Sequence, residues 1–116
     1  MIILVVDDSG PLCELFATAL QQHGHTVVTA GTFVEAHARS LSARPDVVTV
    51  DMVMPDGSGV DLVRLLATQT PRPHIVAISG NADLLAAAHD AGANVTLSKP
   101  FSLAALVDAV DRLVAS

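Results

Sequence analysis

The sequence has few of the residue types on which several classes of protein depend. Among its 116 residues there are one cysteine, Cys13, and three aromatic residues, all of them phenylalanine. A single cysteine cannot form a disulfide within the chain, so a disulfide-stabilised scaffold is excluded. A surface that stacks the bases of a single-stranded nucleic acid needs several aromatic side chains, and these are scarce here.

Positive charge and long apolar runs are also scarce. Six basic residues stand against 12 acidic ones, which gives a formal net charge of −6. Such a chain repels a polyphosphate backbone, so we expect no direct nucleic acid binding. No apolar run approaches the roughly 20 residues of a membrane span, and the first residues lack the pattern of a signal peptide. These absences favour a cytoplasmic protein that makes no membrane contact.

Hydrophobic residues, by contrast, make up 51% of the chain, which is enough to build the core of one domain. Many of them fall in short runs rich in valine and isoleucine. Near-continuous apolar runs of this length predict strands that are buried on both faces, as in a parallel sheet. The runs cover residues 2–6, 26–30, 46–50, 74–79 and 94–98.

Between these runs, apolar residues recur at helical spacing. Two helix starts are marked by pairs that resemble capping boxes, Thr32 with Glu35 and Ser58 with Asp61. Five successive strand–helix units with right-handed crossovers predict an α/β fold. We expect a flavodoxin-like, doubly wound, five-stranded parallel sheet of order 2-1-3-4-5 with five helices. The clearest apolar faces comprise Leu12, Phe16, Ala19 and Leu20, and Leu103, Leu106, Val107, Val110 and Val114.

Polar residues stand at the carboxyl ends of four of these strands. Asp7 and Asp8 follow the first strand and Asp51 follows the third, while Ser79 and Lys99 lie at the ends of the fourth and fifth. In the order 2-1-3-4-5 these ends converge on one crevice, where ligands of such sheets bind. Three carboxylates in one crevice cannot all stay ionised without a cation. Oxygen ligands without a nearby histidine or cysteine favour a hard ion, and Mg²⁺ is the usual choice beside phosphate.

The same residues fit phosphoryl transfer, in which catalysis consists mostly of positioning and charge neutralisation. Lys99 offers a mobile positive charge to an oxyanion, and the Ser79 hydroxyl can donate to another of its oxygens. Asp51 is the best nucleophile, because it is central in the cluster and can become an aspartyl phosphate. The segment DMVMPDGSG predicts a flexible, glycine-containing loop after it. Asp7 and Asp8 then hold the metal.

Four segments together resemble the receiver domain of a two-component response regulator. They are VVDD at 5–8, VDMVMPDGSG at 50–59, ISG at 78–80 and SKPF at 98–101, and they span nearly the whole chain in the order of the family. The resemblance implies a single receiver domain over residues 1–116 with no output domain in this chain. It also implies a phosphorylation-dependent switch that changes its signalling face to regulate an unidentified partner or output domain.

The resemblance assigns a role to each residue of the cluster. Asp51 would accept a phosphoryl group from a sensor histidine kinase or a phosphotransfer protein. Asp8, Asp51 and the backbone carbonyl of Val53 would bind Mg²⁺ directly, and Asp7 would act mainly through water. Ser79 and Lys99 would contact the acyl phosphate. The domain would catalyse only its own phosphorylation and slow dephosphorylation, and would not be an enzyme in the usual sense. A cis Lys99–Pro100 bond is also implied.

The fifth strand departs from the family pattern. Thr96 stands where many receivers carry an aromatic residue, and Asn94-Val95 replaces an acidic pair found in receivers that dimerise. A homodimer through the fourth helix, fifth strand and fifth helix is still an implication of the resemblance. The switch cannot use an aromatic rotamer at Thr96, so we expect it to act through residues 80–82 and the start of the following helix.

Other interpretations stay open at this point. Asp8 could simply cap the next helix, Lys99 could be a solvated charge, and Ser79 could satisfy a turn. A phosphohydrolase with an aspartate nucleophile is a second function, but such enzymes place a carboxylate two residues after the nucleophile, where this chain has Val53. A third is a receiver that takes no phosphate and only docks partners. His23 and His25 show no metal-ligand spacing and are expected to have surface or boundary roles.

Overall fold

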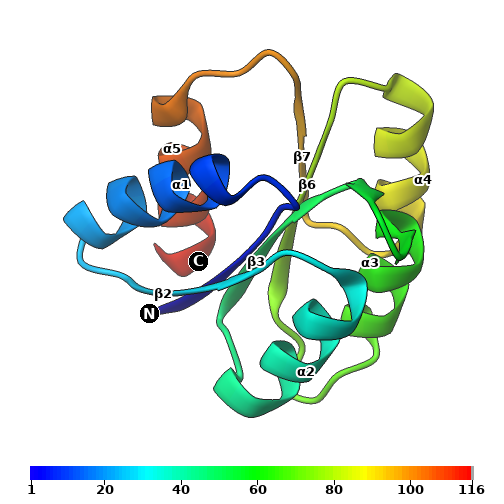
Figure 1. Ribbon diagram of the computed structural model, residues 1–116, viewed down its shortest axis with the longest axis horizontal. Coiled ribbons are helices and arrows are strands. Elements are labelled where there is room, and N and C mark those ends of the chain that lie inside the picture. The colour runs from blue at the N-terminus through cyan, green and yellow to red at the C-terminus, as the bar shows by residue number, and fades with distance from the viewer. Residues whose placement is uncertain (116) are drawn as a thin grey trace.

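Five parallel strands form the sheet on which the chain is built (Figure 1). The computed structural model describes residues 1–115. The strands lie in the order β2-β1-β3-β6-β7, which is the order 2-1-3-4-5 that the sequence predicts. Their bounds are β1 (Ile2–Val6), β2 (Thr26–Ala30), β3 (Val47–Asp51), β6 (His74–Ser79) and β7 (Val95–Ser98).

The predicted strands agree with the observed ones to within one residue at each end, but their burial is uneven. The inner strands β1, β3 and β6 are buried almost throughout, as the apolar runs predict. The outer strands β2 and β7 are only partly buried. An outer strand has one neighbour and less helix cover, so the expectation of burial on both faces is wrong for these two.

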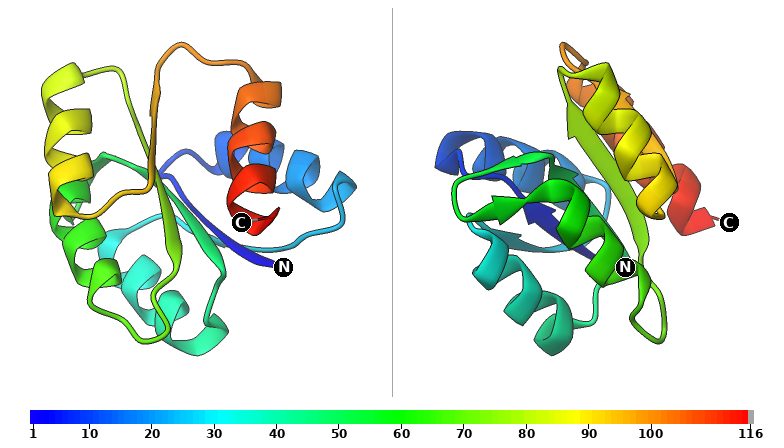
Figure 2. Two further views of the ribbon diagram at one scale, coloured as in Figure 1. Left: turned by 180° about the vertical axis from the view of Figure 1, so that it is seen from behind. Right: turned by 90° about the vertical axis from the view of Figure 1, so that its right-hand side faces the viewer.

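Helices cover both faces of the sheet (Figure 2). On one face α1 and α5 pack over Ile3 and Val5, and on the other α2, α3 and α4 pack over Leu4 and Val6. This division follows from the alternation of side chains along β1. No helix within residues 1–115 is both long and apolar enough to cross a bilayer. The helices are α1 (Gly10–Gln22), α2 (Phe33–Ala43), α3 (Gly59–Ala67), α4 (Ala82–Ala91) and α5 (Leu103–Ala115).

Local side chains explain where two of these helices begin. The Thr32 hydroxyl accepts from the Glu35 amide at 3.1 Å, and the Ser58 hydroxyl accepts from the Asp61 amide at 3.5 Å, so both predicted N-caps are confirmed. The Glu35 carboxylate accepts from the Gly31 amide at 2.8 Å rather than from Thr32. The Asp61 carboxylate instead pairs with an arginine one turn later. Each box is therefore only half formed.

The segment after Asp51 is an ordered hairpin and not the flexible loop that its glycines suggest. Two short antiparallel strands, β4 (Val53–Met54) and β5 (Gly57–Ser58), pair with each other. A Cβ at Gly59 would lie 2.5 Å from the Met52 Cα, so only glycine fits there. The glycines permit close packing at the carboxyl edge of the sheet.

Candidate functional site

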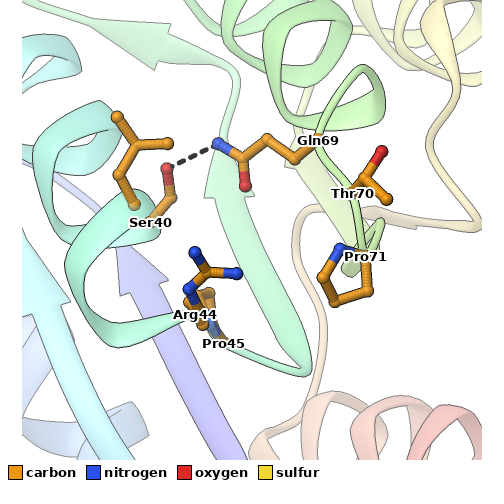
Figure 3. Close-up of a pocket in the computed structure, with 7 residues that line it drawn as sticks. Ser40, Arg44, Pro45, Gln69, Thr70 and Pro71 are labelled. Carbon is orange, nitrogen blue, oxygen red and sulfur yellow. Dashed lines mark hydrogen bonds between the residues drawn. The ribbon is translucent and has the colours of Figure 1, made fainter.

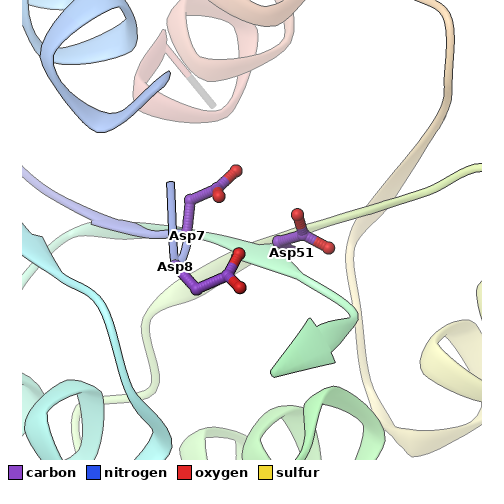
Figure 4. A group of neighbouring side chains, drawn as sticks. All are labelled: Asp7, Asp8 and Asp51. Atoms are coloured by element: carbon purple, nitrogen blue, oxygen red, sulfur yellow. The ribbon is translucent and has the colours of Figure 1, made fainter. Parts of the chain in front are cut away.

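The pairing of β1 with β3 brings three carboxylates together at the carboxyl end of the sheet. Val6 is the partner of Val50, so the residues that follow or end these strands are neighbours. One oxygen from each of Asp7, Asp8 and Asp51 lies within 4.8 Å of the others (Figure 4). Asp7 and Asp51 are buried and Asp8 is exposed, which leaves the cluster open to solvent on one side.

Asp7 is held rigidly in this cluster. Its amide donates to the Ala30 carbonyl at 3.0 Å, and its Oδ1 accepts from the Ser9 amide at 2.9 Å. Burial raises the pKa of the Asp7 carboxyl, and the nearby charges of Asp51 and Asp8 act in the same direction. The Ser9 amide lowers that pKa but does not cancel the effect of burial. A cluster of three carboxylates, in which the pKa of Asp7 is raised, fits a small, hard divalent cation.

Both oxygens of Asp51 have a donor. Oδ1 accepts from the Val53 amide at 3.1 Å, and Oδ2 accepts from the Lys99 ammonium at 3.1 Å. Lys99 reaches Asp51 from β7, two strands away, and its amide is fixed to the Ser79 carbonyl at 3.0 Å. The Lys99–Pro100 bond is cis, as expected. Asp51 therefore has the other two aspartates, Asp7 and Asp8, on one side and the Lys99 ammonium on the other.

Ser79 completes the arrangement at the end of β6. The residue is 3% exposed, and its hydroxyl oxygen accepts from the Asn81 amide at 3.0 Å. The hydroxyl proton remains for an anion in the crevice. Asn81 caps α4, because its side-chain oxygen accepts from the amides of Asp83 and Leu84. Ser79 is thus linked directly to the start of α4.

The structure also tests the purely structural roles that the sequence leaves open for Asp8, His23 and His25. Ser9, not Asp8, caps α1, since its hydroxyl accepts from the Leu12 amide at 3.3 Å. His23 and His25 both bond to the carboxylate of Asp111 on α5, at 3.1 and 2.8 Å. These contacts fit the boundary role expected from the sequence. Among residues 1–115, only the aspartate cluster groups three side chains that could bind a metal ion.

Two residues near the site were missed at the level of sequence. Ser9, followed by Gly10 and Pro11, carries a recognisable helix-start signal that would have identified it as the cap of α1. Asp56 in the hairpin accepts from the first amides of α2. No local signal could have revealed Asp56, because its partners lie more than 20 residues earlier in the chain.

A separate cavity lies at the opposite end of the sheet, between the end of α2 and the loop that follows α3 (Figure 3). The Gln69 amide donates to the Ser40 hydroxyl across it at 2.9 Å. Arg44 lines the same cavity and has a positive φ of 49°. The cavity adjoins the strand starts and shares no residue with the aspartate cluster.

A flavodoxin-like sheet with aspartates, a hydroxyl and a lysine at one crevice defines a class of signalling domain. The family model for the response regulator receiver domain matches residues 3–111. The chain therefore belongs to the response regulator receiver domain family, whose members act in two-component signal transduction.

Named relatives agree with this assignment. The chain is 34% identical to the probable transcriptional regulatory protein TcrX of Mycobacterium tuberculosis and 35% identical to the KDP operon transcriptional regulatory protein KdpE of Escherichia coli, over 90% of its own length in each case. It spans about half the length of these relatives, 46% and 47%. The chemotaxis response regulator CheY4 of Vibrio cholerae superimposes with a TM-score of 0.88 at 28% identity, covering 97% of both chains.

Proposed function

We propose that this domain is a switch in which Asp51 accepts a phosphoryl group, in the presence of Mg²⁺, from a sensor histidine kinase or a phosphotransfer protein. The observation that carries the proposal is the position of Asp51. Its carboxylate is buried beside two other aspartates and also bonds to Lys99 at 3.1 Å. We further propose that the domain works in the cytoplasm and has no enzymatic activity beyond its own phosphorylation and dephosphorylation.

Each residue of the cluster has its own role in binding Mg²⁺. The carboxylates of Asp8 and Asp51 and the carbonyl of Val53 would bind the ion, with Asp7 acting through water. When bound, Mg²⁺ supplies positive charge that neutralises the phosphoryl oxygens. A cluster made of carboxylate oxygens, without histidine or cysteine, supports the choice of this ion.

The transfer itself needs only positioning. An oxygen of Asp51 forms a bond to phosphorus while the bond from phosphorus to the donor imidazole nitrogen breaks, and the electron pair of that bond returns to the nitrogen. The Lys99 ammonium and the Ser79 hydroxyl donate to the phosphoryl oxygens. Ser79 ends β6 and Lys99 directly follows β7, so the two groups would approach the new anion from the ends of different strands.

The link from Ser79 to α4 suggests how the signal leaves the site. When the Ser79 hydroxyl turns toward the phosphoryl group, the Asn81 amide loses its acceptor and the cap of α4 is disturbed. Thr96 is exposed, and Leu97 packs against the α1–α5 side of the sheet. Neither can act as an aromatic switch, so we assign the signal to residues 80–82 and α4. Dimerisation through the α4–β7–α5 face also remains a prediction.

The proposal predicts a stable adduct on incubation with acetyl phosphate and Mg²⁺. Mass spectrometry should detect one added phosphoryl group. Continuous turnover of acetyl phosphate would indicate a phosphohydrolase instead, and neither adduct nor turnover would indicate a domain that only docks partners.

The route of the signal has its own test. In NMR spectra of the free and the beryllofluoride-bound protein, where the adduct stands in for the aspartyl phosphate, the largest shifts should fall in residues 79–92 and around Lys99. Shifts that stay within the aspartate cluster would contradict a route through α4.

A further inference from the structure

The turn of the β4–β5 hairpin is fastened to α2 by one carboxylate. Asp56 Oδ1 accepts from the Phe33 amide at 2.7 Å, and its Oδ2 accepts from the Val34 amide at 3.3 Å. Phe33 and Val34 are the first two residues of α2. The amides of a first helical turn have no partner within the helix, and the end of the helix carries partial positive charge. Asp56 therefore satisfies two amides that the cap Thr32 does not reach.

Packing at the neighbouring glycine supports the same attachment. A Cβ at Gly57 would lie 2.8 Å from the Phe33 ring, so the hairpin rests directly on the first residue of α2. Gly57 is also the strand partner of Met54, whose side chain is buried in the core. The turn of the hairpin is thus held by Asp56 and Gly57 together.

The other end of the hairpin carries Val53. Its side chain is 65% exposed and cannot anchor the strand by burial. Its backbone is held by pairing with Ser58, by the bond from its amide to Asp51 Oδ1 at 3.1 Å, and by its buried neighbours Met52 and Met54. Because Ser58 lies two residues after Asp56 and pairs with Val53, a movement of the hairpin turn acts on the Val53 backbone through that pairing.

We infer that Asp56 is a positioning residue, which fixes the Val53 carbonyl as a metal ligand by fastening the hairpin to α2. This inference rests on the proposed function for its link to Mg²⁺, whereas the attachment itself can be observed without the metal. It also makes the start of α2 part of the support of the phosphorylation site.

Two substitutions separate hydrogen bonding from charge. Asp56→Ala removes both the acceptors and the charge, whereas Asp56→Asn removes the charge but keeps one acceptor oxygen for the Phe33 amide. We expect Asp56→Ala to weaken Mg²⁺ binding roughly tenfold, as is typical when support of a metal ligand is lost. Asp56→Asn should stay within about twofold of the wild type by the same reasoning. Asp61→Ala removes an exposed carboxylate that pairs with Arg64 and serves as the charge-matched control.

Mg²⁺ alone is the probe, titrated by NMR because the chain lacks tryptophan and tyrosine. Hydrogen exchange in the metal-free protein gives an independent measurement. The amides of Phe33 and Val53 should exchange faster in Asp56→Ala and should keep their protection in Asp56→Asn and Asp61→Ala. The Val34 amide, which bonds to the second carboxylate oxygen, should exchange faster in both Asp56 variants.

Equal weakening of Mg²⁺ binding in Asp56→Ala and Asp56→Asn would show a charge effect and overturn the inference. Unchanged exchange at Val53 in Asp56→Ala would overturn it as well. If the wild type bound no Mg²⁺ at the aspartates, the proposed metal site would be wrong. The exchange data would still decide whether Asp56 holds the hairpin.

Discussion

The ion pair of the site joins Asp51, at the end of β3, to Lys99, directly after β7, and these two strands differ greatly in burial. All five residues of β3 are buried, and the strand pairs with β1 on one side and β6 on the other. β7 pairs with β6 in the main sheet, and its residues alternate between partly buried and exposed. The Asp51 side chain is 9% exposed, and that of Lys99 is 41% exposed.

This difference matches the parts that the two side chains play in the proposed switch. A nucleophile must be held in place before the reaction, and β3 provides a rigid base for Asp51. Lysine is a flexible point charge that can follow an anion as it forms. The less deeply buried elements α4 and β7 are where a change of state requires the smallest loss of packing.

The largest effect is expected from a substitution of the nucleophile at the end of β3. Asp51→Asn preserves the shape of the side chain but not its reactive carboxylate, so labelling by acetyl phosphate should fall below detection. The readout is intact-protein mass spectrometry. Asp90→Asn, at an exposed position on α4, is the control and should label like the wild type. Labelling of Asp51→Asn at the wild-type rate would refute the assignment of the acceptor.

Stability should show the same contrast between the strands. Val48 in β3 is fully buried, so Val48→Ala should lower the free energy of unfolding by about 2–3 kcal/mol through lost burial and a residual cavity. Thr96 in β7 is exposed, and Thr96→Ala should change it by no more than about 0.5 kcal/mol. Urea denaturation measures both. Similar losses at the two positions would show that β7 is as firmly held as β3.

The lifetime of the phosphoryl group on Asp51 depends on which side chains beside the acceptor can orient an attacking water. Val53 exposes an apolar side chain next to Asp51, and this side chain cannot orient an attacking water. The side-chain amide of Asn81 could bond to such a water, but its oxygen already accepts from the amides of Asp83 and Leu84 as the cap of α4. We therefore expect slow loss of phosphate in the wild type and severalfold faster loss in Val53→Asn, followed by mass spectrometry over time. An unchanged or slower rate in the variant would remove this explanation.

The smallest expected effect concerns the attachment of α5 to the α1–β2 turn. Hydrogen bonds from His25 and His23 hold the pKa of Asp111 below its usual value of 3.8. A lowered pKa in the folded state stabilises the protein above the unfolded-state pKa, and the gain is lost as the pH falls through the folded-state value. Asp111→Asn should therefore cost about 1 kcal/mol or less at neutral pH, because the pair is partly exposed.

Thermal unfolding between pH 7 and pH 3 checks this sign. The difference in Tm between the wild type and Asp111→Asn should be greatest at neutral pH and shrink below about pH 4. A difference that grows toward acid pH would contradict the direction of the pKa shift.

The strands, their order, and the polar residues at their carboxyl ends can all be predicted from the sequence. Strand identity follows from local runs of apolar residues. Right-handed crossovers reduce the possible strand orders to a few, and the flavodoxin-like order 2-1-3-4-5 is the one that brings the polar strand ends together. Once that order is set, the ends of β1, β3, β6 and β7 must meet. The sequence therefore predicts that Asp7, Asp8, Asp51, Ser79 and Lys99 lie in one crevice.

The contacts between elements that lie far apart in the sequence, by contrast, are visible only in the tertiary structure. The attachment of Asp56 to α2, the bonds from His23 and His25 to Asp111, and the partial exposure of β7 all depend on how helices pack over the sheet. The bonded residues lie 22 to 88 positions apart in the chain. Local patterns report propensity and periodicity within about one element, so they carry no information about contacts that side-chain volume and helix packing create between distant elements.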